Sequence, residues 1–190
     1  NIYESILRWK EYMSYTIEDL TSIDDAIFDT LWDASFARIE SGGTMPWAKY
    51  EVHYGHTLTE EEKKQILHLE FENQLEAPGD DNKLYLCRKD GTPIRLFSAN
   101  KDAEGVAVCR YTLYGPDALG SRAWLYDAAV LRQTRDQLTS DFGVTGHTIH
   151  VVIDSPMHTY YLARDNEREH TVSETQADGI STITFTYNIE

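Results

Sequence analysis

The stretch KLYLCRKDGTPIRLFSA, residues 83–99, decides the fold class because it has the pattern of two strands joined by a tight turn. Lys83–Arg88 and Pro93–Ala99 are rich in apolar residues, and Asp90-Gly91 between them is typical of a two-residue hairpin loop. A third strand is predicted over Val106–Tyr114. The second half of the chain is therefore expected to be built around a mostly antiparallel sheet.

One helix is expected to interrupt these strands. Trp124–Ser140 has apolar residues at helical spacing, and Gly143 is placed to end that helix. Beyond it, an apolar β-branched run predicts a buried strand, and two later segments have strand-like composition. These three predicted strands cover Thr148–Ile153, His158–Ala163 and Ile180–Ile189.

The first half of the chain has a helical period instead. Apolar residues predict a helix within the first twenty residues, and a second helix is expected behind an N-cap at Ser22. Thr59 and Glu62 form a Thr-x-x-Glu capping box that predicts another helix start. The segment from Met45 to Gly55 is expected to be a connection.

The predicted fold class is α+β, with N-terminal helices followed by a mostly antiparallel sheet with one inserted helix. The expected organisation is one domain over residues 1–190, with a helical N-terminal extension at 1–43 and an α+β core at 44–190. Aromatic residues make up 12% of the chain, including 12 Tyr and 4 Trp, and such side chains often line pockets and interfaces.

The formal net charge of -15 limits the partners that the chain can bind. Such a chain repels the phosphates of nucleic acids and anionic lipids, so general nucleic-acid binding and membrane binding are not expected. No stretch has the ~18 apolar residues of a membrane helix. Cys87 and Cys109 lie in strand-like runs outside any metal-ligand spacing, which favours free thiols in the cytoplasm.

The richest polar group in the sequence consists of His147, His150, Asp154 and His158. These residue types bind metals, but on one strand His147 points away from His150 and Asp154. Ser155-Pro156 then breaks the register before His158. Histidines that are hydrogen-bonded or solvated at strand ends are the expected arrangement, and no metal ligand is assigned.

One segment, residues 106–161, resembles the nucleotide-binding part of thymidylate synthase and the related pyrimidine hydroxymethylases. Asp117 matches the Asp of the family's Arg-Ser-x-Asp motif. Asp127 lies near the position at the start of the following helix where the family has an Asn. His158-Thr159-Tyr160 matches the family's His-x-Tyr pair. The family's Arg is replaced, and its Pro-Cys-His nucleophile segment is not recognisable.

The resemblance implies a pyrimidine mononucleotide as partner, a reduced folate as cofactor and a homodimer. His158 and Tyr160 would bind the sugar hydroxyl, Asp127 would read a cytosine-like base, and Asp117 would contact the base or support the nucleotide site. Cys87 is then the candidate catalytic thiol for C5 methyl or hydroxymethyl transfer. A catalytically diverged relative that only binds the nucleotide is equally compatible with these residues.

A non-enzymatic function stays open beside this one. Asp25, Asp29 and Asp33 form an acidic stripe on the second predicted helix. A strongly acidic surface of this kind is typical of an inhibitor or nucleic-acid mimic that covers a basic protein partner. The sequence therefore leaves open whether the chain is an enzyme.

Overall fold

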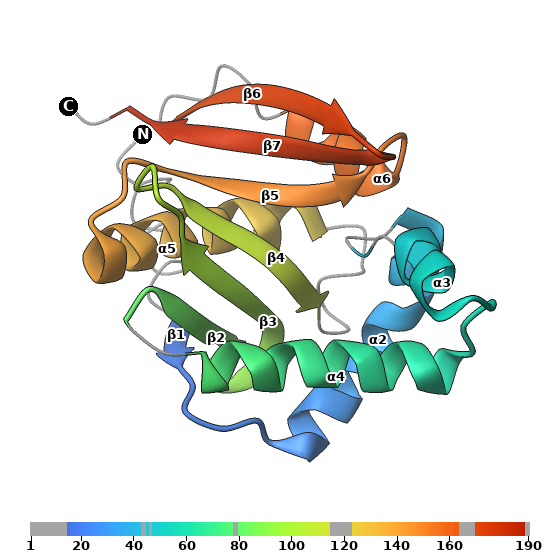
Figure 1. Cartoon of the computed structure of the whole chain (residues 1–190). Coiled ribbons are helices and arrows are strands. Elements are labelled where there is room, and N and C mark those ends of the chain that lie inside the picture. Colours follow the sequence, from blue (N-terminus) through green and yellow to red (C-terminus); the bar gives the residue numbers. More distant parts are fainter. Residues whose placement is uncertain are drawn as a thin grey trace.

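A twisted sheet lies at the centre of the protein, as the computed structural model shows (Figure 1). The structure describes residues 15–42, 45, 47–77, 80–114, 123–163 and 170–188. Within these residues the sheet has seven strands in the order β1-β2-β3-β4-β5-β7-β6. The elements are β1 (Tyr15–Asp19), α2 (Asp25–Gly42), α3 (Trp47–Tyr54), α4 (Glu60–Glu76), β2 (Asn82–Lys89), β3 (Thr92–Lys101), β4 (Ala107–Tyr114), α5 (Ala123–Phe142), β5 (Gly146–Val152), α6 (Pro156–Leu162), β6 (His170–Ala177) and β7 (Ile180–Tyr187).

The α+β class with a mostly antiparallel sheet is confirmed. The hairpin of β2 and β3 turns at Asp90 and Gly91, which have φ angles of 48° and 82°. Positive φ at both positions is what a type I′ turn requires, and it matches the right-handed twist of the paired strands. The hairpin that Asp90-Gly91 predicted is therefore confirmed.

Two hydrophobic layers hold helices on opposite faces of the sheet. On one face, Leu138 and Phe142 of α5 pack with Tyr85 and Phe97. On the other, α2, α3 and α4 cover the leucines of the central strands, and Figure 1 shows α4 lying across that face. This second layer contains Phe28, Leu31, Trp32, Trp47, Leu67, Phe71, Leu84, Leu86, Leu96 and Leu113.

Helix starts are set by side-chain oxygens that accept hydrogen bonds from free N–H groups. At α4, Thr59 Oγ1 accepts from the Glu62 N–H at 3.2 Å, and Glu62 Oε2 accepts from the Thr59 N–H at 2.8 Å. This is the predicted capping box. At α2 the expected N-cap Ser22 was wrong by two residues, since Asp24 Oδ1 accepts from the Ile27 N–H at 3.0 Å.

Three local expectations were wrong. Residues 15–19, expected to be helical, form the edge strand β1, which pairs antiparallel with β2. The expected connection at Trp47–Tyr54 is helix α3. The strand expected at His158–Ala163 is helix α6, which begins with Ser155 as N-cap and Pro156 at its first position. Proline there has a suitable φ and lacks a donor that would be unpaired anyway.

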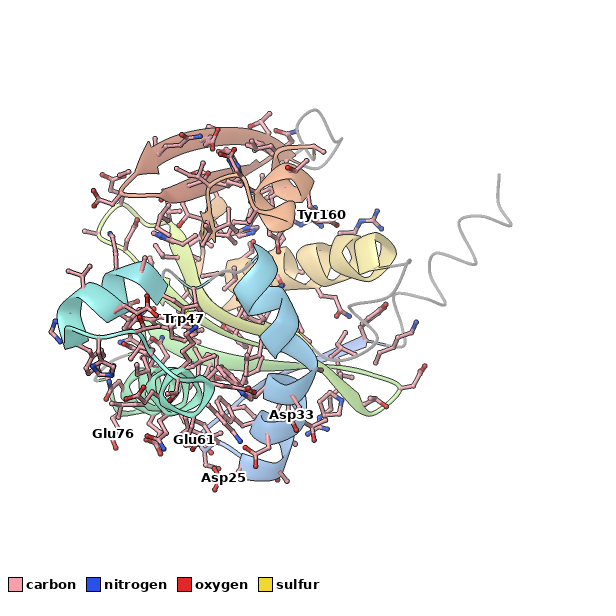
Figure 2. The ribbon with its side chains drawn as sticks, turned by 90° about the vertical axis from the view of Figure 1, so that its right-hand side faces the viewer. Asp25, Asp33, Trp47, Glu61, Glu76 and Tyr160 are labelled. Atoms are coloured by element: carbon pink, nitrogen blue, oxygen red, sulfur yellow. The ribbon has the colours of Figure 1, made fainter. Side chains whose placement is uncertain are left out.

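The acidic stripe of α2 faces α4 as well as solvent (Figure 2). Asp29 Oδ1 lies 2.8 Å from Lys64 Nζ, and Asp25 Oδ1 lies 3.0 Å from His68 Nε2. Two of the three predicted stripe residues therefore connect the two helices to each other. No helix in the described part of the chain combines the length and apolar character that a membrane crossing needs.

Candidate active site

The two central strands of the sheet separate from each other shortly after they meet. β4 and β5 are parallel and pair at only three positions, Ala107–Cys109 with His147–Ile149. Beyond these positions β4 stays paired with β3, and β5 stays paired with β7 (Figure 1). The facing edges of the two strands then carry peptide groups that do not pair with each other. Ligands of open sheets bind at such a point between parallel strands.

A β-bulge in β4 marks the position where the strands separate. Phe97 pairs with Thr112 and Ala99 with Cys109, so Arg110 and Tyr111 together oppose Ser98. At the bulge, Ser98 Oγ accepts a hydrogen bond from the Tyr111 N–H at 3.2 Å. Ser98 is completely buried. Bulges of this kind bend a strand and redirect a side chain next to a site.

The redirected residue Tyr111 belongs to a group of aromatic and acidic side chains from three elements. Its ring packs edge-on against Phe71 of α4, with 6.4 Å between the centroids. Its side chain is close enough to Tyr50 of α3 to act on the pKa of that phenol. The Tyr50 hydroxyl donates to Glu70 Oε1 of α4 at 3.3 Å. Burial raises the pKa of Tyr50 above its usual range, and the charges of Tyr111 and Glu70 add to that shift.

A second polar cluster fixes the helix that follows β5. The backbone N–H of Asp154 donates to His158 Nδ1 at 3.0 Å, so the histidine proton is on Nε2 and points to Glu174 Oε1 at 2.5 Å. Hydrogen bonds from Gln176, Ser181 and His158 lower the pKa of Glu174 to about 2. The cluster ties the start of α6 to the β6–β7 hairpin.

The predicted site residues that the structure describes lie on different elements. His158 and Tyr160 both lie on α6. Cys87 lies on β2, fully buried, and burial raises the pKa of its thiol to about 12, so it does not provide a thiolate at neutral pH. Asp117 lies outside the described residues, as does the side chain of Asp127, whose backbone is part of α5.

The histidine group is also divided. His147 is buried and stacks on Phe185 at 4.9 Å, and its Nδ1 lies 2.6 Å from the Tyr187 hydroxyl. Burial, with the nearby charge of Arg95, lowers the pKa of His147 to about 3. Among the described residues, no three His, Cys, Asp or Glu side chains form a group that could hold a metal ion.

Sequence reasoning did not single out Ser98, Tyr111, Tyr50 or Glu70. The only signal for them was the high aromatic content, which indicated that some Tyr and Trp residues line a pocket or interface. Their position depends on a bulge and on strand pairing between segments far apart in the chain. No local motif records either feature.

No protein-family model matches the chain, and no curated protein matches it in sequence. Solved structures do share its fold. An acetyltransferase from Salmonella typhimurium that modifies the N-terminal serine of a ribosomal protein aligns with a TM-score of 0.57 and 11% identity, over 93% of this chain and 96% of its own. The N-acetyltransferase PseH from Campylobacter jejuni aligns with a TM-score of 0.54 and 10% identity, over 92% of this chain and 99% of its own.

The PaiA N-acetyltransferase from Thermoplasma acidophilum, solved in complex with coenzyme A, aligns with a TM-score of 0.52 and 14% identity, over 90% of this chain and 99% of its own. At these identities the alignments establish a shared fold. The chain therefore has the fold of the N-acetyltransferases.

This fold overturns the interpretation as a thymidylate synthase relative. The predicted pyrimidine-nucleotide function, the pyrimidine mononucleotide partner and the reduced folate cofactor were wrong, because the similar structures are acetyltransferases, some solved with coenzyme A or acetyl-CoA. The His-x-Tyr match at His158 and Tyr160 lies in helix α6, where the resemblance placed a strand end. The implied homodimer loses its basis with the resemblance, and the alternative of a non-enzymatic acidic inhibitor is not supported either.

Proposed function

We propose that the chain is an N-acyltransferase that transfers an acetyl group from acetyl-CoA to an amine. The observation that carries the proposal is the separation of β4 from β5 at the Arg110–Tyr111 bulge. The pantetheine arm of CoA is a slender chain of amide groups. It fits as an added strand between two edges whose peptide groups do not pair with each other.

The phosphates of CoA have a candidate position at the start of α5. This helix has 20 residues and no acidic residue in its first turn. The free N–H groups and the dipole at a helix N-terminus favour phosphate. The connection from β4 contains Gly115, Gly120 and Arg122 in sequence. Glycine allows close approach of a backbone to a ligand, and arginine pairs with phosphate.

The net charge of -15 acts on the two substrates in opposite directions. It repels the phosphates of CoA, so their binding must come from local donors, and it concentrates cationic amines near the surface. Acidic side chains lie along both α2 and α4: Figure 2 labels Asp25 and Asp33 on α2, and Glu61 and Glu76 at the two ends of α4. A positively charged amine is therefore the acceptor that this surface favours.

In the reaction, the neutral amine nitrogen attacks the thioester carbonyl carbon. The new C–N bond forms and the C–S bond breaks. The nitrogen releases one proton to water, the CoA sulfur takes up one proton from its donor, and water returns a proton to that donor. Tyr160 lies on α6, the helix that follows β5, and is seen above α2 and α5 in the view of Figure 2; its side chain is half-buried. We assign it the role of proton donor to the sulfur.

The two cysteines are free and buried, and a cytoplasmic location stays a prediction.

The experiment that tests this function is a thermal-shift titration with acetyl-CoA, CoA, and deoxycytidine monophosphate with a reduced folate. A ligand at one hundred times its Kd stabilises the folded state by about 2.7 kcal/mol. For a chain of this size that corresponds to a rise in Tm of roughly 5–10 °C. We expect this rise in Tm with acetyl-CoA and with CoA, and no rise with deoxycytidine monophosphate and the reduced folate. A protein whose Tm does not respond to acetyl-CoA is not an acetyltransferase of this kind.

A further inference from the structure

The residue assigned as proton donor, Tyr160, lies on a helix that is too short to be stable by itself. α6 has seven residues, whereas isolated helices shorter than about 12–15 residues are marginal in water. The position of α6 beside the sheet must therefore come from its contacts with other elements. Figure 1 shows α6 next to the end of the β6–β7 hairpin.

One of these contacts is apolar. Tyr161 is buried, and its ring packs edge-on against Phe185 of β7, with 6.0 Å between the ring centroids. Because the hydrophobic effect is non-directional, this contact holds α6 against the sheet without setting the rotation of the helix about its own axis. The rotation needs a second, directional contact.

His158, in the first turn of α6, makes that directional contact. Its Nδ1 accepts the backbone N–H of Asp154 at 3.0 Å, which leaves the ring proton on Nε2. Nε2 lies 2.5 Å from Glu174 Oε1 of β6. The His158 side chain is 9% exposed and that of Glu174 24% exposed, so little water competes for the hydrogen bond between them.

Glu174 is held in place by its own neighbours on the hairpin. Ser181 Oγ donates to Glu174 Oε1 at 2.7 Å, and Gln176 Nε2 donates to it at 2.8 Å. Ser181 is completely buried. The hairpin also holds the chain just after β5, where the Ile153 N–H donates to the Gly179 carbonyl at 3.1 Å. The end of β5 and the start of α6 are therefore both fixed by the hairpin.

The polar and the apolar contact together determine the direction of Tyr160. At about 100° per residue, His158 and Tyr161 lie about 60° apart on one side of the helix. Tyr160 lies about 160° from His158 and about 100° from Tyr161, and its side chain is half-buried. Since the phenol oxygen lies far from the helix axis, a small rotation of α6 displaces it. A displacement of about 1 Å can cost about 10²-fold in rate.

We propose that His158 and Glu174 are positioning residues that hold Tyr160 where it can protonate the CoA sulfur. This inference rests on the proposed acetyl transfer. As the C–S bond breaks, the O–H bond of Tyr160 breaks and an S–H bond forms, and water returns a proton to the phenolate. His158 and Glu174 exchange no proton with either substrate. They act through the rotation of α6.

The test measures CoA release at saturating acetyl-CoA for Glu174→Ala, His158→Ala, Tyr160→Phe and the double variant Glu174→Ala/Tyr160→Phe. The acceptors are spermidine and a seryl peptide, or water alone if neither amine raises the rate. Thr175→Ala, at an exposed position on the same strand, is the matched control. Glu174→Gln is a second variant at the glutamate, because its amide oxygen can accept the same hydrogen bonds without the charge.

We expect Glu174→Ala and His158→Ala to lose about tenfold to a hundredfold in kcat, with the KM for acetyl-CoA unchanged. Glu174→Gln should keep most of its kcat even where its Tm falls, which separates position from stability. In Tyr160→Phe the proton donor is absent, so adding Glu174→Ala should cause no further loss of kcat.

Two results would overturn the positioning role: losses that multiply in the double variant, and a full kcat in Tyr160→Phe or in the two alanine variants. A raised KM at unchanged kcat in His158→Ala would make the histidine a ligand contact and would also overturn it. Failure of the proposed function is distinguished by the unsubstituted chain, which would then release no CoA with any acceptor and show no rise in Tm with acetyl-CoA.

Discussion

Replacing Ser98 by alanine removes the acceptor that the bulge in β4 needs. Ser98 is completely buried, and its Oγ accepts the Tyr111 N–H at 3.2 Å. A buried N–H that loses its acceptor costs about 1–3 kcal/mol. For a chain of this size the expected fall in Tm is roughly 2–12 °C. The vacated space is one oxygen atom, so the cost comes from the unpaired donor more than from lost packing.

The same substitution should weaken the binding of CoA more than its effect on stability alone explains. Without the Ser98 hydroxyl, the bulge that directs β4 away from β5 is no longer the favoured arrangement. Urea unfolding and a CoA titration of Ser98→Ala measure the two effects. The matched control is Ser173→Ala on the exposed strand β6, expected within about 0.5 kcal/mol of the unsubstituted chain. If Ser98→Ala behaves like that control in both assays, the bulge does not depend on this hydrogen bond.

Two further predictions concern pH. The pKa of His147 is lowered to about 3 in the folded chain. Between this pH and the ordinary histidine pKa, the unfolded chain therefore binds one proton more than the folded chain. Stability should fall by about 1.4 kcal/mol per pH unit from this group as pH decreases below about 6.5. Urea midpoints of His147→Phe between pH 7 and pH 4 should lack that one-proton slope, and an unchanged slope would contradict it. The pKa of Glu174 is lowered to about 2, so its stabilising effect is present above about pH 4.5 and is lost as pH falls toward 2. Glu174→Gln should be less stable at pH 7, with a difference that narrows in acid; a constant difference would show that the carboxylate charge is not the cause.

The parts of the fold that were predictable from sequence depend on neighbours in the chain. The Asp90-Gly91 turn and the Thr59 capping box involve residues within a few positions, and both formed as predicted. Strand β1 has its partner far away, since Tyr15 pairs with Lys89. Its apolar residues fit a helical period equally well, and tertiary pairing decided between the two.

The region after β5 shows how one sequence signal can be misinterpreted. Ser155-Pro156 was interpreted as a break between strands, although a capping serine followed by proline is also a helix start. In the structure Ser155 Oγ accepts the His158 N–H at 3.1 Å and α6 begins. The motif match at His158 and Tyr160 assumed an extended backbone, so it failed with that assumption. The candidate site was beyond reach for a similar reason, because β4 and β5 meet across almost forty intervening residues.

The short pairing of β4 with β5 divides the sheet into two parts, each of which is paired more extensively within itself than with the other. β1 to β4 form one plate and β5, β7 and β6 another, and only three residue pairs join them directly. α5 supports both plates, since Gln133 Nε2 donates to the Tyr15 carbonyl at 3.0 Å while Leu138 packs in the cluster that contains Ile149. Across this seam, the line along which β4 and β5 pair, the two plates are therefore joined by α5 and its apolar layer more than by strand pairing. A molecule wedged into the open end of the seam would bind the two plates together and stiffen the whole protein.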